Sequence, residues 1–135
     1  MSTLEQQQLL PGVTGSAHCP VTKENTAAAM GSGDLPVFAT PALAACMERA
    51  AAESVRPLLG EGQTTVGVRL ALEHTAATPV GMDVRCESTL TLVEGRRLTF
   101  SILAYDDAGE IGRAEHARVI VGAARFLERA EGKRT

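Results

Sequence analysis

The fold of this chain is decided by the stretch TPALAACMERAAAESVRP, residues 40–57. A threonine followed by a proline is typical of a helix start, so we expect Thr40 as the N-cap and Pro41 as the first helical residue. Pro57 and Gly60 end the pattern. The apolar residues keep the three-and-four spacing of a helix with one buried face: Leu43, Cys46, Met47, Ala50, Ala51, Val55 and Leu58. The stretch therefore predicts one long helix from Ala42 to Arg56.

Four strands are predicted after this helix, because apolar and polar residues alternate there with a period of two. In the first strand, we expect the side chains from Val66 to His74 at even positions on the core face, with Gly67 on the other face. Short turns containing Gly95 and Gly109 join the later strands, which indicates hairpins and an antiparallel sheet. The predicted strands are Thr64–Thr75, Met82–Val93, Leu98–Asp106 and, approximately, Glu110–Phe126.

One further strand is predicted before the helix, from Val13 to Val21, and the segment Thr22–Pro36 is expected to be irregular with a flexible part at residues 31–34. The expected fold class is α+β, with an antiparallel sheet that curls around one long helix. We expect a loose segment at 1–12, a single domain at 13–126 and a polar tail at 127–135. An uncovered sheet face and open strand edges favour a dimer.

Composition excludes several kinds of protein. The chain has 135 residues, 13 basic and 16 acidic, and a net charge of -3, without the basic stripe that nucleic acid binding requires. Cys19, Cys46 and Cys86 have no spacing typical of a disulfide framework or a zinc site, which favours a reducing cytoplasm. Neither a secretory segment nor a membrane-spanning stretch is expected, so we predict a cytoplasmic protein with no membrane partner.

Three polar residues lie in patterns that are otherwise apolar. His74 falls on the expected core face where its strand reaches a loop, which suits either a structural histidine or one that meets a ligand. Glu48 lies among alanines in the helix, either as an exposed glutamate near Arg49 or as a poised carboxylate. The hydroxyl of Thr40 is suited either to capping the helix or to chemistry. The residues alone leave these alternatives open.

Several runs of sequence together resemble a known family. They are FAT at 38–40, ME at 47–48, HTAATP at 74–79, VEGRRL at 93–98, EIG at 110–112 and HARVI at 116–120. These runs are similar to hotdog-fold acyl-CoA thioesterases related to fluoroacetyl-CoA thioesterase. The resemblance implies a hotdog fold and a homodimer, with a dimer of dimers left open. It also implies catalytic roles for Thr40, Glu48 and His74.

The resemblance implies substrate contacts as well. Gly67 would line the acyl site, Arg118 would contact the CoA part, and Phe38 would be a further substrate-binding residue. A thioester carbonyl needs a nucleophile, a base and donors for the oxyanion, which this set of residue types can supply. Either the threonine attacks the thioester or a water molecule does, and both mechanisms remain open here. No metal and no cofactor other than the CoA of the substrate are expected, because the three histidines are far apart in sequence.

The expected function is therefore hydrolysis of an acyl-CoA thioester to the free acid and CoA. The segment Met30–Pro36 contains no aromatic residue, whereas the fluoroacetyl-specific enzyme has aromatic lid residues there, so we expect a small or medium acyl group. His116 is expected to have a structural role. The alternative function is a non-catalytic acyl-CoA-binding module of the same fold. A hotdog hydratase is disfavoured, because no aspartate lies five residues before any histidine.

Overall fold

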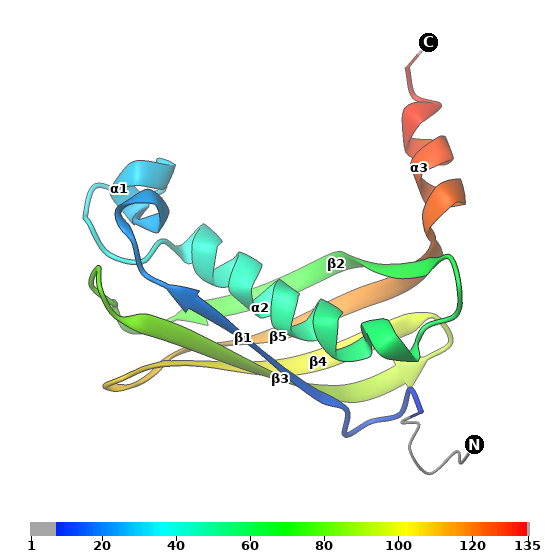
Figure 1. Ribbon diagram of the computed structural model, residues 1–135, viewed down its shortest axis with the longest axis horizontal. Helices are drawn as coiled ribbons and strands as arrows, with labels where there is room; N and C mark the ends of the chain where they lie inside the picture. Colours follow the sequence, from blue (N-terminus) through cyan, green and yellow to red (C-terminus); the bar gives the residue numbers. More distant parts are fainter. Residues whose placement is uncertain (1–7, 135) are drawn as a thin grey trace.

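The computed structural model describes residues 8–134, which form one antiparallel sheet curled around a long helix, α2 (Figure 1). The strands are β1 (Thr14–Pro20), β2 (Gln63–His74), β3 (Asp83–Glu94), β4 (Arg97–Asp106) and β5 (Gly109–Gly122). The helices are α1 (Ala27–Met30), α2 (Thr40–Val55) and α3 (Ala123–Glu131), with short 3-10 turns at Lys23–Asn25 and Arg56–Leu58. The strand order is β1-β3-β4-β5-β2, and neighbouring strands run antiparallel. The predicted α+β architecture is confirmed.

The core lies between α2 and the concave face of the sheet. The buried residues of α2 are Ala42, Leu43, Cys46, Met47, Ala50, Ala51 and Val55, as its spacing predicts, whereas Leu58 falls in the following 3-10 turn and is half-buried. The sheet contributes large side chains such as Leu90, Phe100 and Ile102. Burying a side chain of this size contributes about 1.5–3 kcal/mol. The alanines keep the helix slim, so that β1 approaches it closely at Gly15.

The expected alternation in β2 is wrong in its first half, because the strand contains a β-bulge. Gly67 pairs with Arg118 of β5 and Arg69 pairs with Ala117, so that Val68 is the extra residue. Val68 is accordingly 50% exposed. An extra residue reverses the inward and outward positions on its two sides. Gly67 therefore faces α2, on the same side of the sheet as His74.

A second irregularity changes the end of β3. The predicted alternation holds through Leu90, but the register shifts between Leu90 and Leu92 in the pairing with β4. Leu92, expected to be buried, is 46% exposed, while Val93 packs against the core instead. Both corrections have the same cause, since a period-two pattern cannot reveal where one residue is inserted into a strand.

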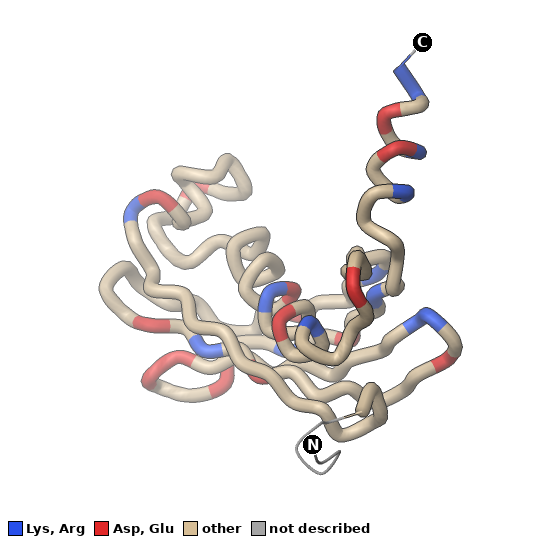
Figure 2. The backbone as a smooth tube through the Cα atoms, turned by 45° about the vertical axis from the view of Figure 1, so that its right-hand side comes forward, with Lys and Arg blue, Asp and Glu red and all other residues tan. Residues whose placement is uncertain are grey.

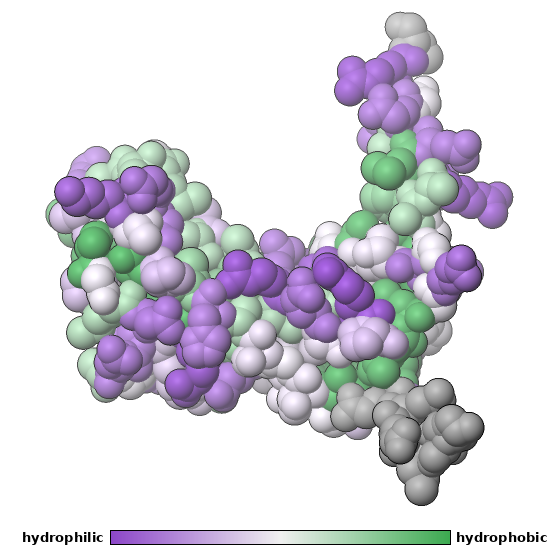
Figure 3. Space-filling model, viewed as in Figure 1, coloured by the Kyte–Doolittle hydropathy of each residue, from purple (hydrophilic) through white to green (hydrophobic). Residues whose placement is uncertain are grey.

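The C-terminal part also differs from expectation. The last strand ends at Gly122 rather than near Phe126, and the following residues form α3, which crosses the boundary expected between domain and tail. Figures 1 and 3 show α3 standing away from the body of the molecule. Phe126 and Leu127 are exposed on it. The sequence does not predict this helix, which is short and buries none of its residues.

The segment Thr22–Pro36 is less irregular than expected, since it contains α1 and the 3-10 turn before it. The expected loose segment at 1–12 lies partly outside the described residues, and within the described part the N–H of Gly12 donates to the carbonyl of Leu90. Basic and acidic residues are interleaved along the chain, including on α3 (Figure 2). Among residues 8–134, no helix is both long and apolar enough to span a bilayer.

Candidate active site

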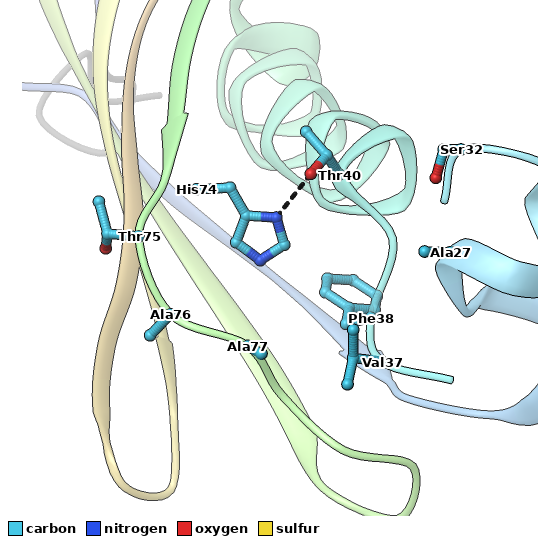
Figure 4. Close-up of a pocket in the computed structure, with 9 residues that line it drawn as sticks. All are labelled: Ala27, Ser32, Val37, Phe38, Thr40, His74, Thr75, Ala76 and Ala77. Carbon is cyan, nitrogen blue, oxygen red and sulfur yellow. Dashed lines mark hydrogen bonds between the residues drawn. The ribbon is translucent and has the colours of Figure 1, made fainter. Parts of the chain in front are cut away.

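Thr40 and His74 meet at one end of α2. Oγ1 of Thr40 lies 2.8 Å from Nδ1 of His74, a hydrogen-bonding distance (Figure 4). The expected N-cap role of Thr40 is wrong, because the N-cap is Ala39 and Thr40 is the first residue of the helix. The hydroxyl is thus directed at the imidazole of a residue 34 positions later instead of at the backbone of its own helix.

The imidazole of His74 is partly withdrawn from water. Burial lowers its pKa below the ordinary histidine value of 6.5, so the ring is neutral at pH 7. Its Nε2 atom is buried and has no hydrogen-bond partner among residues 8–134. A neutral histidine whose Nδ1 accepts from a hydroxyl can act as a general base toward that hydroxyl.

A pocket of about 270 Å³ opens beside this pair (Figure 4). It is lined by both polar and apolar residues from three segments: Ala27, Ser32, Val37, Phe38, Thr40, His74, Thr75, Ala76 and Ala77. Phe38 is buried, and the N–H of Ala39 beside it donates to the carbonyl of Asn25. The pocket therefore combines a hydroxyl and a base in a small hollow with polar and apolar walls.

Glu48 belongs to a second polar cluster, about two turns along α2 from Thr40. Its Oε2 atom lies 3.8 Å from Nη1 of Arg118 and 3.9 Å from Nε2 of His116. The side chain of Glu48 is 44% exposed, while Arg118 and His116 are buried. The carboxylate thus has a cation on its buried side and water on the other.

Arg118 is held by several hydrogen bonds. Its Nε donates to Oγ1 of Thr65 over 2.8 Å, and its Nη2 donates to the carbonyl of Thr65 over 3.0 Å. Nη1 lies 3.2 Å from Nε2 of His116. Burial lowers the pKa of Arg118, and the negative charge of Glu48 opposes that shift. These contacts leave the Nη1 end of the guanidinium directed toward Glu48.

The contacts of His116 fix its tautomer. Nδ1 lies 2.7 Å from the carbonyl oxygen of Arg69, which can only accept, so Nδ1 carries the proton. Nε2 is then the acceptor for the N–H of Arg118. Burial lowers the pKa of His116, and the adjacent guanidinium lowers it further. His116 is a neutral residue that orients Arg118.

Gly67 is the point at which this cluster converges. A Cβ atom at Gly67 would lie 2.5 Å from Oε2 of Glu48, 3.2 Å from Nη1 of Arg118 and 3.3 Å from Cε1 of His116. Contacts under 3.0 Å force one partner to move, so any side chain at this position displaces the carboxylate. The bulge at Val68 is what turns Gly67 toward the helix.

The predicted site residues thus form two groups. Thr40, His74 and Phe38 meet at the pocket, whereas Glu48, Gly67 and Arg118 form the second cluster with His116 and Thr65. Sequence reasoning gave His116 a structural role and did not consider Thr65. The one available signal was that Arg118, His116 and Ile120 share the inward positions of a single strand. Catalytic roles for Thr40, Glu48 and His74 stay a prediction.

Comparisons with known proteins identify the family. Residues 21–124 match the family described as fluoroacetyl-CoA-specific thioesterase. The fluoroacetyl-CoA thioesterase of Streptantibioticus cattleyicolor is 36% identical over 97 residues, which cover 72% of this chain and 70% of that protein. A solved structure of a fluoroacetyl-CoA thioesterase superposes with a TM-score of 0.89 at 29% identity, covering 96% of this chain and 100% of that one.

A hot-dog-like protein from Thermanaerovibrio acidaminovorans has a TM-score of 0.84 and is 26% identical, covering 93% of both chains. This likeness confirms the expected hotdog fold, in which the sheet is wrapped around the long helix. The family match spans both polar clusters, from Phe38 to Arg118. The chain therefore belongs to the fluoroacetyl-CoA-specific thioesterase family, a family of hotdog-fold thioester hydrolases.

Proposed function

We propose that this protein hydrolyses small or medium acyl-CoA thioesters through Thr40, Glu48 and His74, without a metal or a separate cofactor. The observation that carries the proposal is the 2.8 Å contact between Oγ1 of Thr40 and Nδ1 of His74 at the wall of a pocket. A threonine hydroxyl is a weak nucleophile unless a base lies within hydrogen-bonding reach. The neutral imidazole of His74 meets that requirement.

In the covalent form of the mechanism, Oγ1 of Thr40 bonds to the thioester carbonyl carbon and its proton passes to His74. The carbon–sulfur bond then breaks, and the thiolate of CoA takes the proton from His74. Water, activated by the same base, releases the acid. In the alternative form, His74 deprotonates a water molecule that Thr40 holds. In the first turn of α2, Pro41 has no N–H and the N–H of Leu43 donates to the carbonyl of Ala39. Among residues 8–134 this leaves the N–H groups of Thr40 and Ala42 to stabilise the oxyanion, together with the helix dipole.

Glu48 is assigned a role in catalysis because its carboxylate is both oriented and accessible. The positive charge of Arg118 lies on its buried side, and 44% of the side chain is exposed. A carboxylate in that setting can hold a water molecule or the substrate next to Gly67. We propose that Arg118 acts on the substrate through the second N–H of Nη1, because Thr65 occupies its Nε and Nη2 groups and His116 accepts from the first N–H of Nη1.

The size of the pocket supports the proposed substrate class. A volume of about 270 Å³ lies just below the usual range of ligand sites, roughly 300–1,000 Å³. A hollow of this size suits an acyl group and leaves the pantetheine and nucleotide parts of CoA outside it. The lining contains one aromatic residue, Phe38. We therefore favour small or medium acyl groups rather than fluoroacetyl alone.

We also propose that the protein works as a homodimer. In the described sheet, β1 and β2 are the edge strands, and an open edge is a surface for pairing with another chain. Apolar side chains are exposed near the β2 edge at Val68, and on α3 at Phe126 and Leu127. Sedimentation of the wild type against a Phe126→Asp, Leu127→Asp double variant tests this: a monomeric wild type contradicts the proposal.

Thiol release from acyl-CoA thioesters tests the activity. The panel runs from acetyl through long-chain and aromatic acyl groups and includes fluoroacetyl-CoA. We expect turnover of short acyl groups by the wild type and its loss in His74→Ala. His18→Ala is the matched control, because His18 is an exposed histidine bonded to Asp83 on β3, outside the pocket. Silence across the panel with acyl-CoA still bound would favour the non-catalytic binding module.

A further inference from the structure

Thr78 lies in the loop after His74, and it is fully buried although its side chain ends in a hydroxyl group. That hydroxyl donates a hydrogen bond to Oδ2 of Asp106 over 2.8 Å. The other carboxylate oxygen, Oδ1, accepts from the N–H groups of Ala108 at 2.8 Å and Gly109 at 3.2 Å. Asp106 is thus fixed by the turn between β4 and β5, and its carboxylate is a rigid anchor for Thr78.

The backbone of Thr78 holds the opposite wall of the pocket. Its carbonyl oxygen accepts from the N–H of Phe38 over 2.9 Å. The adjacent residues Val37 and Pro79 form an isolated antiparallel bridge. Phe38 lies two residues before Thr40 (Figure 4), so this contact connects Thr78 to the start of α2. The buried residue Thr78 therefore links the β4–β5 turn to the segment that precedes Thr40.

The same loop carries His74 at its other end. Thr75, directly after the histidine, donates its N–H to the carbonyl of Ile111 over 2.7 Å. The chain between Thr75 and Thr78 is thus tied to the sheet at both ends, once through β5 and once through the β4–β5 turn. The side chains of Ala76 and Ala77, which line the pocket, lie between these two attachments.

We infer that Thr78 and Asp106 are positioning residues that hold His74 at hydrogen-bonding distance from Thr40. The inference rests on the proposed function of the Thr40–His74 pair. Neither Thr78 nor Asp106 is among the residues that line the described pocket. Their effect on the reaction must therefore pass through the geometry of the loop, and a displacement of about 1 Å between reacting groups can lower a rate by about 100-fold.

The test is steady-state thioester hydrolysis by Thr78→Val, which replaces the hydroxyl with a methyl group of similar shape. We expect kcat to fall by about 10- to 100-fold, with a much smaller change in KM, because the residue does not touch the substrate. Thr78→Ser restores the donor and is expected to recover most of the rate. Thr91→Val is the matched control. It removes the hydrogen bond from the hydroxyl of Thr91 to the carbonyl of Thr99, near the end of β3 that is farther along the chain from Thr78.

A spectroscopic measurement separates positioning from a simple loss of stability. The pKa of His74 is lowered by burial, so a loosened loop should let it rise toward its ordinary value, measured by NMR titration of the folded variant. If Thr78→Val does not fold, Thr78→Ala gives the decision, since it removes the hydroxyl donor without placing a methyl group against Oδ2 of Asp106. An unchanged kcat in the folded variants overturns the inference.

His74→Ala, assayed in parallel, distinguishes failure of the proposed catalytic site from failure of the positioning role. If this variant keeps the wild-type rate, the proposed site is wrong and the positioning role is overturned with it. If it loses activity while Thr78→Val and Thr78→Ala retain theirs, only the positioning role is overturned. Loss in all three, with recovery in Thr78→Ser, supports both.

Discussion

Gly67 faces Glu48 so closely that a single Cβ atom at Gly67 would lie 2.5 Å from Oε2 of the glutamate. The contact joins the bulged strand β2 to the middle of α2. Gly67→Ala should fold, because the atom that must move is the end of a flexible side chain. The alanine should displace the carboxylate from Arg118 and lower kcat/KM by about tenfold or more.

Gly122→Ala is the matched control for this substitution. Gly122 pairs with Gln63 in the same two strands, has an ordinary φ of -78°, and would bring its Cβ within 4 Å of nothing in the described residues. Circular dichroism confirms that both variants are folded before their rates are compared. Equal rates for Gly67→Ala and Gly122→Ala would show that the position of Glu48 does not matter for turnover.

Thr40 should tolerate serine far better than valine. Thr40→Ser keeps the hydroxyl that lies 2.8 Å from Nδ1 of His74, whereas Thr40→Val keeps the shape and removes the hydroxyl. We expect a loss within about tenfold for serine and about 100-fold or more for valine. Mass spectrometry of rapidly quenched wild type then tests for an acyl group on Thr40. A valine variant that is as active as the serine variant would contradict either role for this hydroxyl.

The rate should depend on pH through His74. The base must be neutral, and burial lowers its pKa below 6.5, so kcat/KM should stay constant above that pH and fall below it. Stability should depend on pH in the same direction as the rate. The folded state disfavours protonation of His74 and His116, so the free energy of unfolding decreases as the pH falls below 6.5. A pH–rate profile and an NMR titration of the histidines measure both effects. An acid limb centred above pH 6.5 is incompatible with this assignment.

Two leucines on β3 should differ strongly in their contribution to stability. Leu90 is fully buried and Leu92 is 46% exposed, because the bulge between them reverses the alternation. Leu90→Ala should lower the free energy of unfolding by about 2–5 kcal/mol and Leu92→Ala by about 0.5 kcal/mol or less. Denaturant titration measures both, and equal losses would argue against the bulge.

The sequence predicts α2 and the β3–β4 and β4–β5 hairpins, because helix spacing and glycine turns are local signals. It does not predict that β1 lies beside β3 or β2 beside β5, because these pairings join segments far apart in sequence. Within the site it selects Thr40 and His74, which the structure brings together. It misses the orientation of Gly67, since one inserted residue at Val68 changes no composition or turn. It also misses the anchoring of Thr78, because a threonine hydroxyl gives no sign of which distant carboxylate it will meet.

The bulge at Val68 gives the two halves of β2 opposite parity. Odd-numbered residues point inward before it, at Thr65 and Gly67, and even-numbered residues point inward after it, from Leu70 to His74. One strand can therefore supply side chains to two neighbouring sites, to one from its odd-numbered residues and to the other from its even-numbered residues. A relative that lost this one residue could keep its histidine beside the threonine and yet turn its glycine outward. The length of this strand therefore determines which chemistry the fold can support.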